Sequence, residues 1–369
     1  MDPETITNRP TRSKALRPLA ALGLGMTGAL MLAAPILAQQ RSGTGDRPSR
    51  QCLQEIARLC GRDRSAIPAC LQSRADQLSS TCRGEVRSRL EERRSQARDA
   101  APFQRTMTPA RAIVYGADKR QQIDLYEPED AVDDLPLILF IHGGGWSMGS
   151  HQLVQQKPVH FTNANRFFAS AGYRLLPEAP VEEQARDVGA ALRALVGQAE
   201  VIGFDPSNIV VMGHSAGAHL AALVASDPQY AGSAFDAIRG VILLDGAGYD
   251  IAATIARARD RMSTLEGART LNLYRDAFGE EETRQRNLSP ITHIGGRDAP
   301  HWLALFVDTR TQARLQAEAL VAALDAAGAD ANALAIENTD HGRMNREVGT
   351  PAGAQQTEAI EAFLARILR

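Results

Sequence analysis

A serine between two glycines is the first feature of this sequence able to do chemistry. Residues 213–217 read Gly-His-Ser-Ala-Gly, after the apolar run 209–212 and before a helical pattern. A turn from strand to helix strains the serine backbone, requires small neighbours and lifts the hydroxyl above the sheet. The setting predicts that Ser215 is a nucleophile. The five-residue pattern alone also fits a serine that caps a helix.

A glycine run follows a second predicted strand. Residues 142–146 read His-Gly-Gly-Gly-Trp and come directly after the apolar stretch 137–141. Successive glycines leave backbone N–H groups free to approach a developing alkoxide, so this loop is predicted to form an oxyanion hole together with the N–H of Ala216. We expect His142 to brace the loop. A phosphate-binding loop is the alternative, but the Lys and Ser/Thr of a P-loop are absent.

A base and an acid are needed to activate the serine. His341 lies after the last predicted strand, and the chain order Ser, acid, His is typical of hydrolases with a nucleophile elbow. We expect His341 to take the Ser215 proton and return it to the leaving group. Asp308, which ends the strand predicted at 302–307, is expected to orient the imidazole. Asp298 precedes that strand, and Asp325 and Asp330 lie in or after the following helix. Asp340 adjoins His341 in sequence and is badly placed to reach its far nitrogen.

Alternating strand and helix patterns position these residues. After a short hairpin, apolar runs predict strands at 137–141, 209–212, 241–244, 302–307 and 334–336, and helical spacing predicts helices at 188–196, 216–225, 312–327 and 357–368. This alternation predicts an α/β fold with a mostly parallel sheet and helices on both faces. Reactive loops of such sheets lie at the carboxyl ends of the strands, where all three motifs fall.

The cysteines divide the chain. Its 369 residues are 44% hydrophobic and 23% charged with a formal charge of -2, which is typical of a globular protein and argues against nucleic acid as a partner. All four cysteines, Cys52, Cys60, Cys70 and Cys82, lie in one short stretch near the N-terminus. This asymmetry predicts two parts that are stabilised in different ways.

Residues 51–83 predict a helical hairpin held by disulfides. The segment has too few apolar residues for a core of its own, and an even number of cysteines in a secreted chain implies disulfides. Of three possible pairings, an antiparallel hairpin favours the nested one, Cys60 with Cys70 and Cys52 with Cys82. A four-cysteine zinc site is the alternative, but the separations of 8, 10 and 12 residues lack close C-x2-C pairs.

The N-terminus predicts an export signal. Basic residues precede 21 uncharged residues at 18–38, so we expect a secretory signal peptide over residues 1–38; an uncleaved membrane anchor is the alternative. Either places the rest of the chain outside the cytoplasm, secreted or periplasmic, with no stable membrane insertion if the signal is cleaved. Residues 39–50 are predicted to be a linker. Residues 84–104 are predicted to be a polar linker or helix, with arginines available to an anionic envelope surface.

The region 105–369 resembles the hormone-sensitive-lipase-like and feruloyl-esterase-like carboxylesterases of the α/β-hydrolase superfamily. Besides the two glycine motifs, residues 173–178 read Tyr-Arg-Leu-Leu-Pro-Glu, Leu-Asp-Gly follows a strand at 244–246, and Ser-Pro stands at 289–290. The resemblance implies that the N–H groups of Gly144, Gly145 and Ala216 form the oxyanion hole, and that Arg174 and Asp187 have structural roles. The chain departs from the family in a shortened stretch after Pro180 and in a loop after Asp308 that lacks D-x-x-V.

The cysteine-rich segment resembles the repeat of Golgi apparatus glycoproteins and of scattered bacterial secreted proteins. That resemblance covers about 35 residues and implies no chemistry. The segment is the part of the chain expected to contact a partner or the envelope.

The sequence as a whole predicts a secreted serine carboxylesterase that acts on short acyl or aryl esters through an acyl-enzyme. This chemistry needs no metal and no organic cofactor, and its partner is a small-molecule ester. An amidase or formamidase is an alternative because both substrate classes give the same tetrahedral intermediate. A non-catalytic binding protein with this fold is another. The segment 249–292, between strands, is expected either to cover the pocket and set acyl preference or to be a surface excursion.

Overall fold

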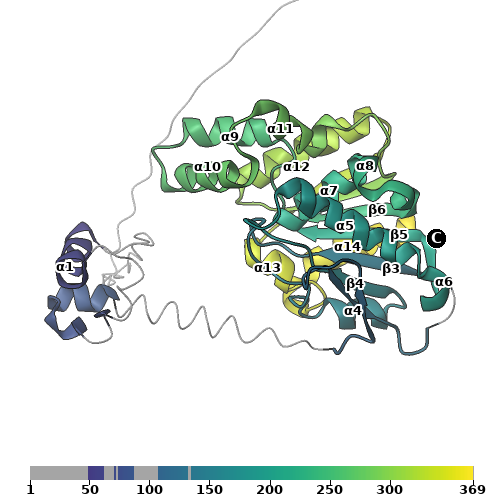
Figure 1. Cartoon of the computed structure of the whole chain (residues 1–369), viewed down its shortest axis with the longest axis horizontal. Helices are drawn as coiled ribbons and strands as arrows, with labels where there is room; N and C mark the ends of the chain where they lie inside the picture. The colour runs from purple at the N-terminus through teal and green to yellow at the C-terminus, as the bar shows by residue number, and fades with distance from the viewer. Residues whose placement is uncertain (1–48, 62–69, 72–73, 87–106, 132–133, 369) are drawn as a thin grey trace, which may run out of the picture. The chain divides into compact units, whose positions relative to one another are not determined.

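The structure is a computed structural model that describes residues 49–61, 70–71, 74–86, 107–131 and 134–368 (Figure 1). The chain divides into two compact units, one up to residue 91 and one from residue 92 onward. The expected signal peptide at 1–38 and most of the two expected linkers lie outside the described residues. Within the described parts, no helix has both the length and the apolar character needed to cross a membrane.

An eight-stranded sheet forms the centre of the larger unit, with the order β1-β2-β4-β3-β5-β6-β7-β8. Strand β2 pairs antiparallel with β1 and β4, and all other neighbours are parallel. The expected mostly parallel sheet is therefore confirmed. The strands are β1 (Arg111–Val114), β2 (Gln122–Tyr126), β3 (Leu135–Ile141), β4 (Phe167–Ala171), β5 (Phe204–His214), β6 (Ile238–Leu244), β7 (His301–Val307) and β8 (Asp330–Ile336).

Helices cover both faces of this sheet, as expected. Alternate residues of each strand point to opposite faces, so Leu139 and Val211 pack in one core with α5, α7 and α12, whereas Phe140 and Met212 pack in another with α4, α13 and α14. The helices are α4 (Lys157–Asn163), α5 (Val181–Val196), α6 (Ala199–Ile202), α7 (Ala216–Ser226), α8 (Pro228–Ala231), α9 (Ile251–Asp260), α10 (Leu265–Phe278), α11 (Glu282–Asn287), α12 (Thr311–Ala326), α13 (His341–Arg346) and α14 (Ala354–Ile367).

Strand β4 was not predicted from the sequence. Its run Phe-Phe-Ala-Ser-Ala is fully buried, but it contains no β-branched residue and only two large ones, so its strand signal is weak. It ends next to the segment that holds Arg174. That arginine makes a two-pronged ion pair with Asp187 of α5, at 2.7 and 2.8 Å, and so ties the end of β4 to the helix.

The smaller unit contains α1 (Arg50–Cys60), η1 (Ala75–Gln77) and a helical segment at 80–86. Its disulfides join Cys52 to Cys82 and Cys60 to Cys70, which is the nested pairing. All four sulfurs are therefore bonded, and none is left as a thiolate for the alternative zinc site. Ile56 and Leu78 pack against the first disulfide in a small apolar cluster.

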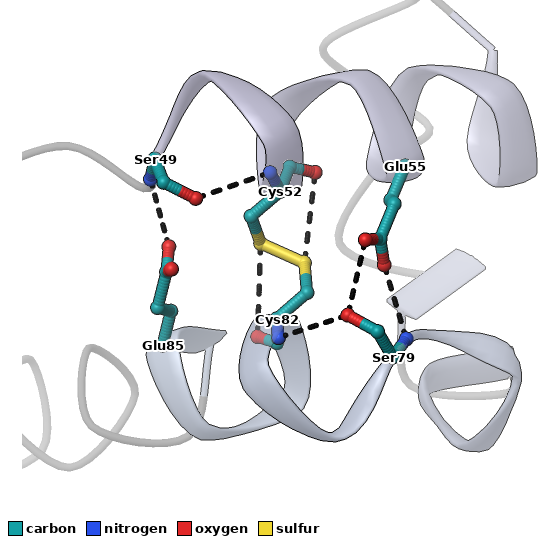
Figure 2. The surroundings of a disulfide bond; sticks show 6 residues. All are labelled: Ser49, Cys52, Glu55, Ser79, Cys82 and Glu85. Carbon is teal, nitrogen blue, oxygen red and sulfur yellow. Dashed lines mark hydrogen bonds between the residues drawn. A yellow bond between two sulfur atoms is a disulfide. The ribbon is translucent and has the colours of Figure 1, made fainter.

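Two helix starts in this unit cap each other across the disulfide (Figure 2). The hydroxyl of Ser79 accepts the N–H of Cys82 at 3.2 Å and donates to Glu55 at 3.0 Å, and the Ser79 N–H also donates to Glu55. The corresponding contacts on the other side are Cys52 N–H to Ser49 Oγ and Ser49 N–H to Glu85, at 3.2 and 2.7 Å.

Each half of this arrangement has the same spacing, Ser-x-x-Cys-x-x-Glu, at 49–55 and again at 79–85. The carboxylate of one half receives the free N–H of the serine that begins the other helix. Such contacts satisfy donors that a helix start otherwise leaves unpaired, and they place negative charge at the positive end of the helix dipole. Capping and disulfides thus compensate for a small apolar core.

Candidate active site

Ser215 stands between the end of β5 and the start of α7, in the strained backbone conformation that its motif predicts. Its φ is 55° and its ψ is -120°. A side-chain carbon at Gly213 would collide with the carbonyl of Gly217, and one at Gly217 would collide with the carbonyl of Ile141. The flanking glycines are therefore required by the close approach of the turn to α7 and to β3.

His341 faces the serine. It follows β8 and begins α13, where Asp340 caps the helix by accepting the Arg343 N–H at 2.8 Å. The imidazole Nε2 lies 3.0 Å from Ser215 Oγ, which is within the reach of a general base. The structure thus brings together the expected nucleophile and the expected base.

The carboxylate beside His341 belongs to Asp245, not to Asp308, so the expected placement of the acid is corrected. His341 Nδ1 lies 2.6 Å from Asp245 Oδ2, and the other carboxylate oxygen accepts the Val307 N–H at 3.1 Å. The Asp245 side chain is fully buried. Asp308 is exposed, and its carboxylate accepts the N–H of the adjacent Thr309.

Sheet geometry explains the difference. Strand β6 lies beside β5 and β7 lies one strand further away, so a residue that ends β6 is nearer to the serine. After β7 the chain turns tightly, with the Arg310 N–H bonded to the Val307 carbonyl, and Asp308 faces solvent. The order Ser, acid, His fits both carboxylates. Asp245 directly follows a buried strand, but so does Asp308, so this position in the sequence does not distinguish the two.

Charge around Asp245 keeps it ionised. Burial opposes ionisation, but the hydrogen bond from His341 and the positive charge of Arg310 outweigh it, and the pKa of Asp245 is lowered. Arg310 Nη1 contacts Asp245 Oδ2 directly and lies 2.6 Å from His341 Nδ1. An anionic acid can hold the imidazole with its proton on Nδ1, which leaves Nε2 free to accept the serine proton.

Two buried groups fix the helix that carries His341. His214 Nε2 lies 2.9 Å from the carbonyl of His341, and burial lowers the pKa of His214 to about 3, so it is neutral and donates there. Lys157 is fully buried and donates to the Asn345 carbonyl at 2.7 Å, and burial lowers its pKa to about 7. Sequence reasoning identified neither of these supports.

The glycine loop passes close to Ser215. A methyl group at Gly143 would lie 3.1 Å from Ser215 Cβ, and Gly144 and Gly145 have φ values of 135° and 58°, which favour glycine. The loop thus lies close to Ser215, and α7 begins at the next residue, Ala216.

His142 contacts the first glycine of this loop. Its Nδ1 lies 2.9 Å from the Gly143 carbonyl, and its ring stacks on Tyr173 with the ring centres 4.3 Å apart. The Tyr173 hydroxyl donates to the His142 carbonyl at 2.8 Å. Burial lowers the pKa of His142 to about 4, so the ring is neutral. These contacts agree with a role of His142 in holding the loop in place.

Trp146, at the end of the glycine loop, is enclosed by the inserted helices. Its indole N–H donates to His219 Nδ1 at 3.2 Å, and its ring meets Tyr274 and Phe278 of α10 edge to face. Leu273 of the same helix reaches the loop, since a methyl group at Gly145 would lie 3.2 Å from its Cδ1. Helix α10 therefore covers the glycine loop, and the segment 249–292 is more than a surface excursion.

Comparison with known proteins agrees with this architecture. The family BD-FAE matches residues 123–305. Carboxylesterase NlhH of Mycobacterium tuberculosis is 40% identical over 106 residues, which cover 28% of this chain and 33% of that protein. Kynurenine formamidase of Danio rerio is 23% identical over 230 residues, which cover 62% of this chain and 73% of that protein. This chain thus spans about a third of the NlhH relative.

Solved esterases superimpose on most of the chain. The apo form of Thermogutta terrifontis esterase 2 is 24% identical, with a TM-score of 0.57, and covers 71% of this chain and 96% of its own. This protein has the α/β-hydrolase fold. Esterase B of Lactobacillus rhamnosis shares that fold, with 21% identity, a TM-score of 0.56, and coverage of 76% of this chain and 94% of its own. In this fold the reactive loops lie at the carboxyl ends of central strands, which is where the serine turn follows β5 and the glycine loop follows β3.

Metal ligands do not gather near this site in the part of the chain that the structure describes. No group of three or more His, Cys, Asp or Glu side chains there is arranged to hold an ion.

Proposed function

We propose that this protein is a serine hydrolase that cleaves carboxylic esters through an acyl-enzyme. One observation carries the proposal, the continuous hydrogen-bonded chain from Ser215 Oγ through His341 to the buried carboxylate of Asp245, at 3.0 and 2.6 Å. Nucleophile, base and orienting acid in this order are what acyl transfer requires. The carboxylesterases and methylesterases among the relatives support the ester class.

The proposed reaction has two halves. His341 Nε2 removes the hydroxyl proton as Ser215 Oγ attacks the ester carbonyl, and the N–H groups of Gly144, Gly145 and Ala216 stabilise the oxyanion. His341 then protonates the departing alcohol, which leaves a serine ester. In the second half, His341 takes a proton from water, the hydroxide displaces Ser215 from the acyl group, and the serine regains its proton.

Formamide hydrolysis is the second candidate. The match to Kynurenine formamidase of Danio rerio extends over 62% of this chain, well beyond the stretch shared with NlhH. An amide and an ester pass through the same kind of tetrahedral intermediate, so the site geometry fits both. The choice therefore needs a direct assay.

The test is an assay of p-nitrophenyl esters of rising acyl length beside a p-nitroanilide and N-formylkynurenine. We expect turnover of the short esters, and S215A should lose it while keeping the wild-type fold. If the wild-type protein turns over only N-formylkynurenine, formamide hydrolysis replaces ester hydrolysis as the proposed reaction. S215A with full ester activity would refute the mechanism.

We also propose that the mature protein works outside the cytoplasm. The two disulfides of the small unit support this because such bonds persist in oxidising compartments. Cell fractionation with N-terminal sequencing of the mature protein tests both the location and the expected cleavage after Ala38. Deletion of residues 39–100 tests whether the small unit recruits the hydrolase, because a recruiting unit is needed for location but not for turnover of soluble esters.

A further inference from the structure

Arg310 occupies an unusual position beside the proposed triad. It follows β7, three residues after Val307, and its guanidinium contacts the same Asp245 oxygen that binds His341. The Nη1 atom is also 2.6 Å from His341 Nδ1 and 3.5 Å from the Asp245 carbonyl. The Arg310 side chain is 38% exposed, whereas the Asp245 side chain is fully buried.

Two donors therefore share one carboxylate oxygen. With its proton on Nδ1, the imidazole donates to Asp245 Oδ2, and Arg310 brings a permanent positive charge to the same atom. A buried carboxylate is costly unless a positive charge compensates it. If Arg310 were absent, the nearest group able to become positive would be His341 itself. An imidazolium has no lone pair on Nε2 and cannot act as a base.

We propose that Arg310 is a positioning residue that compensates the charge of Asp245, so that His341 stays neutral and the enzyme is active at a lower pH than the bare pair would allow. This inference rests on the proposed serine mechanism. The loop after β7, where sequence reasoning placed the acid, thus contributes a cation to the same acid–base pair.

Other charged or titratable groups near the pair do not replace Arg310. His214 from β5 is neutral and already donates to the His341 carbonyl, and Lys157 from α4 is engaged with the Asn345 carbonyl. Tyr249 and Tyr274 are buried, and burial raises the pKa of each well above 10, so they stay neutral. On α13 the charged residues are Arg343 and Arg346, and Asp340 is its N-cap.

Arg343 is used elsewhere, because it binds Glu347 at 2.7 Å and the Asn338 carbonyl at 3.1 Å. Among the residues that the structure describes, Arg310 is thus the one permanent cation that contacts the Asp245 carboxylate.

The test is the pH profile of kcat/KM for a short p-nitrophenyl ester in R310M, R310K and wild type. R310M should move the pH of half-maximal kcat/KM on the acidic limb upward by about 1 unit or more, because a charge within hydrogen-bond distance shifts such equilibria by roughly 1–3 units. At alkaline pH, R310M should recover to within a few-fold of wild type. R310K keeps the charge and should restore most of the wild-type profile.

The matched control is R314M, which removes an exposed arginine one turn further along α12. R314M should leave the pH of half-maximal kcat/KM unchanged. An R310M profile that is lower at every pH with an unchanged midpoint would overturn the inference and leave Arg310 as a tether between β6 and β7. Thermal unfolding of each variant shows whether a loss of activity comes from misfolding.

A second readout is the rate at which a fluorophosphonate labels Ser215 as a function of pH. In this step the serine oxygen bonds to phosphorus, fluoride leaves and His341 takes the proton, so it reports the base without ester turnover. In R310M, the pH of half-maximal labelling rate should shift upward together with the pH of half-maximal kcat/KM. If wild type and S215A are labelled alike, the proposed function fails; if only the shift is missing, the inference about Arg310 fails.

Discussion

Asp245 Oδ2 and His341 Nδ1 lie 2.6 Å apart although 96 residues separate them in the chain. The contact joins the carboxyl end of β6 to the first residue of α13. The sheet makes it possible, because the Ser215 N–H bonds to the Leu244 carbonyl and the Asp245 N–H bonds to the Leu305 carbonyl, which aligns the ends of three strands. A buried carboxylate and a half-exposed imidazole thus meet at the carboxyl end of the sheet.

Replacing this acid provides the most direct check of the corrected assignment. D245N should lower kcat for ester hydrolysis by about 10³- to 10⁴-fold, because an amide no longer fixes the productive imidazole tautomer. D308N is the matched control, because Asp308 is exposed and its carboxylate accepts a hydrogen bond from the N–H of the adjacent Thr309. It should stay within about 3-fold of wild type. Steady-state kinetics of the two variants test the assignment. A larger loss of kcat in D308N than in D245N would assign the acid role to Asp308.

Features that a local sequence pattern specifies could be predicted, whereas features that depend on tertiary contacts could not. Strand and helix periodicity, the turn around Ser215 and the glycine loop are local patterns, and the structure places them as expected. The acid is set by which strand end lies nearest the serine, and that depends on sheet order and on the tight turn after Asp308. Supports such as Lys157 and His219 are fixed by tertiary contacts, which no local pattern encodes.

Glu361 predicts a measurable acid dependence of stability. It binds His160 at 2.9 Å and Arg166 at 2.8 Å, and so ties α14 to α4 and to the start of β4. Burial opposes its ionisation, but these partners lower its pKa from 4.5 to about 2. A lowered pKa means that the ionised group stabilises the fold above about pH 4.5 and loses this contribution as the pH falls toward 2.

We therefore expect E361Q to reduce the free energy of unfolding by on the order of 2 kcal/mol at neutral pH, and the difference from wild type to shrink as the pH falls below about 4.5. Urea unfolding at several pH values measures it. E358Q is the control, because Glu358 is exposed on the same helix and should show little effect. A difference that does not change with pH would show that Glu361 acts by packing alone.

The paired caps of the small unit predict a crossed pattern of local stability. Glu55 holds the N–H of Ser79, and Glu85 holds the N–H of Ser49. E55A should speed amide exchange at Ser79 by about 5-fold, in line with a cap worth about 1 kcal/mol, and should leave Ser49 unchanged. E85A should do the opposite. Exchange measured by NMR on the full chain checks this, and equal effects of each variant at both serines would contradict reciprocal capping.

Leu273 is expected to limit the length of substrate that fits beside the glycine loop. Its Cδ1 would lie 3.2 Å from a methyl group at Gly145, and its side chain is 41% exposed, so it stands at the edge of the site. L273A should open space there and raise the ratio of kcat/KM for a p-nitrophenyl octanoate over an acetate by about 10-fold, the scale of one methylene contact.

Leu265 supplies the matched control for this variant. It lies two turns earlier on α10 with the same 41% exposure, so L265A removes the same atoms at another place on the helix. We expect L265A to leave the acyl-length ratio unchanged. If L273A and L265A change the ratio equally, helix α10 acts through its overall stability and Leu273 does not form the wall of the acyl site.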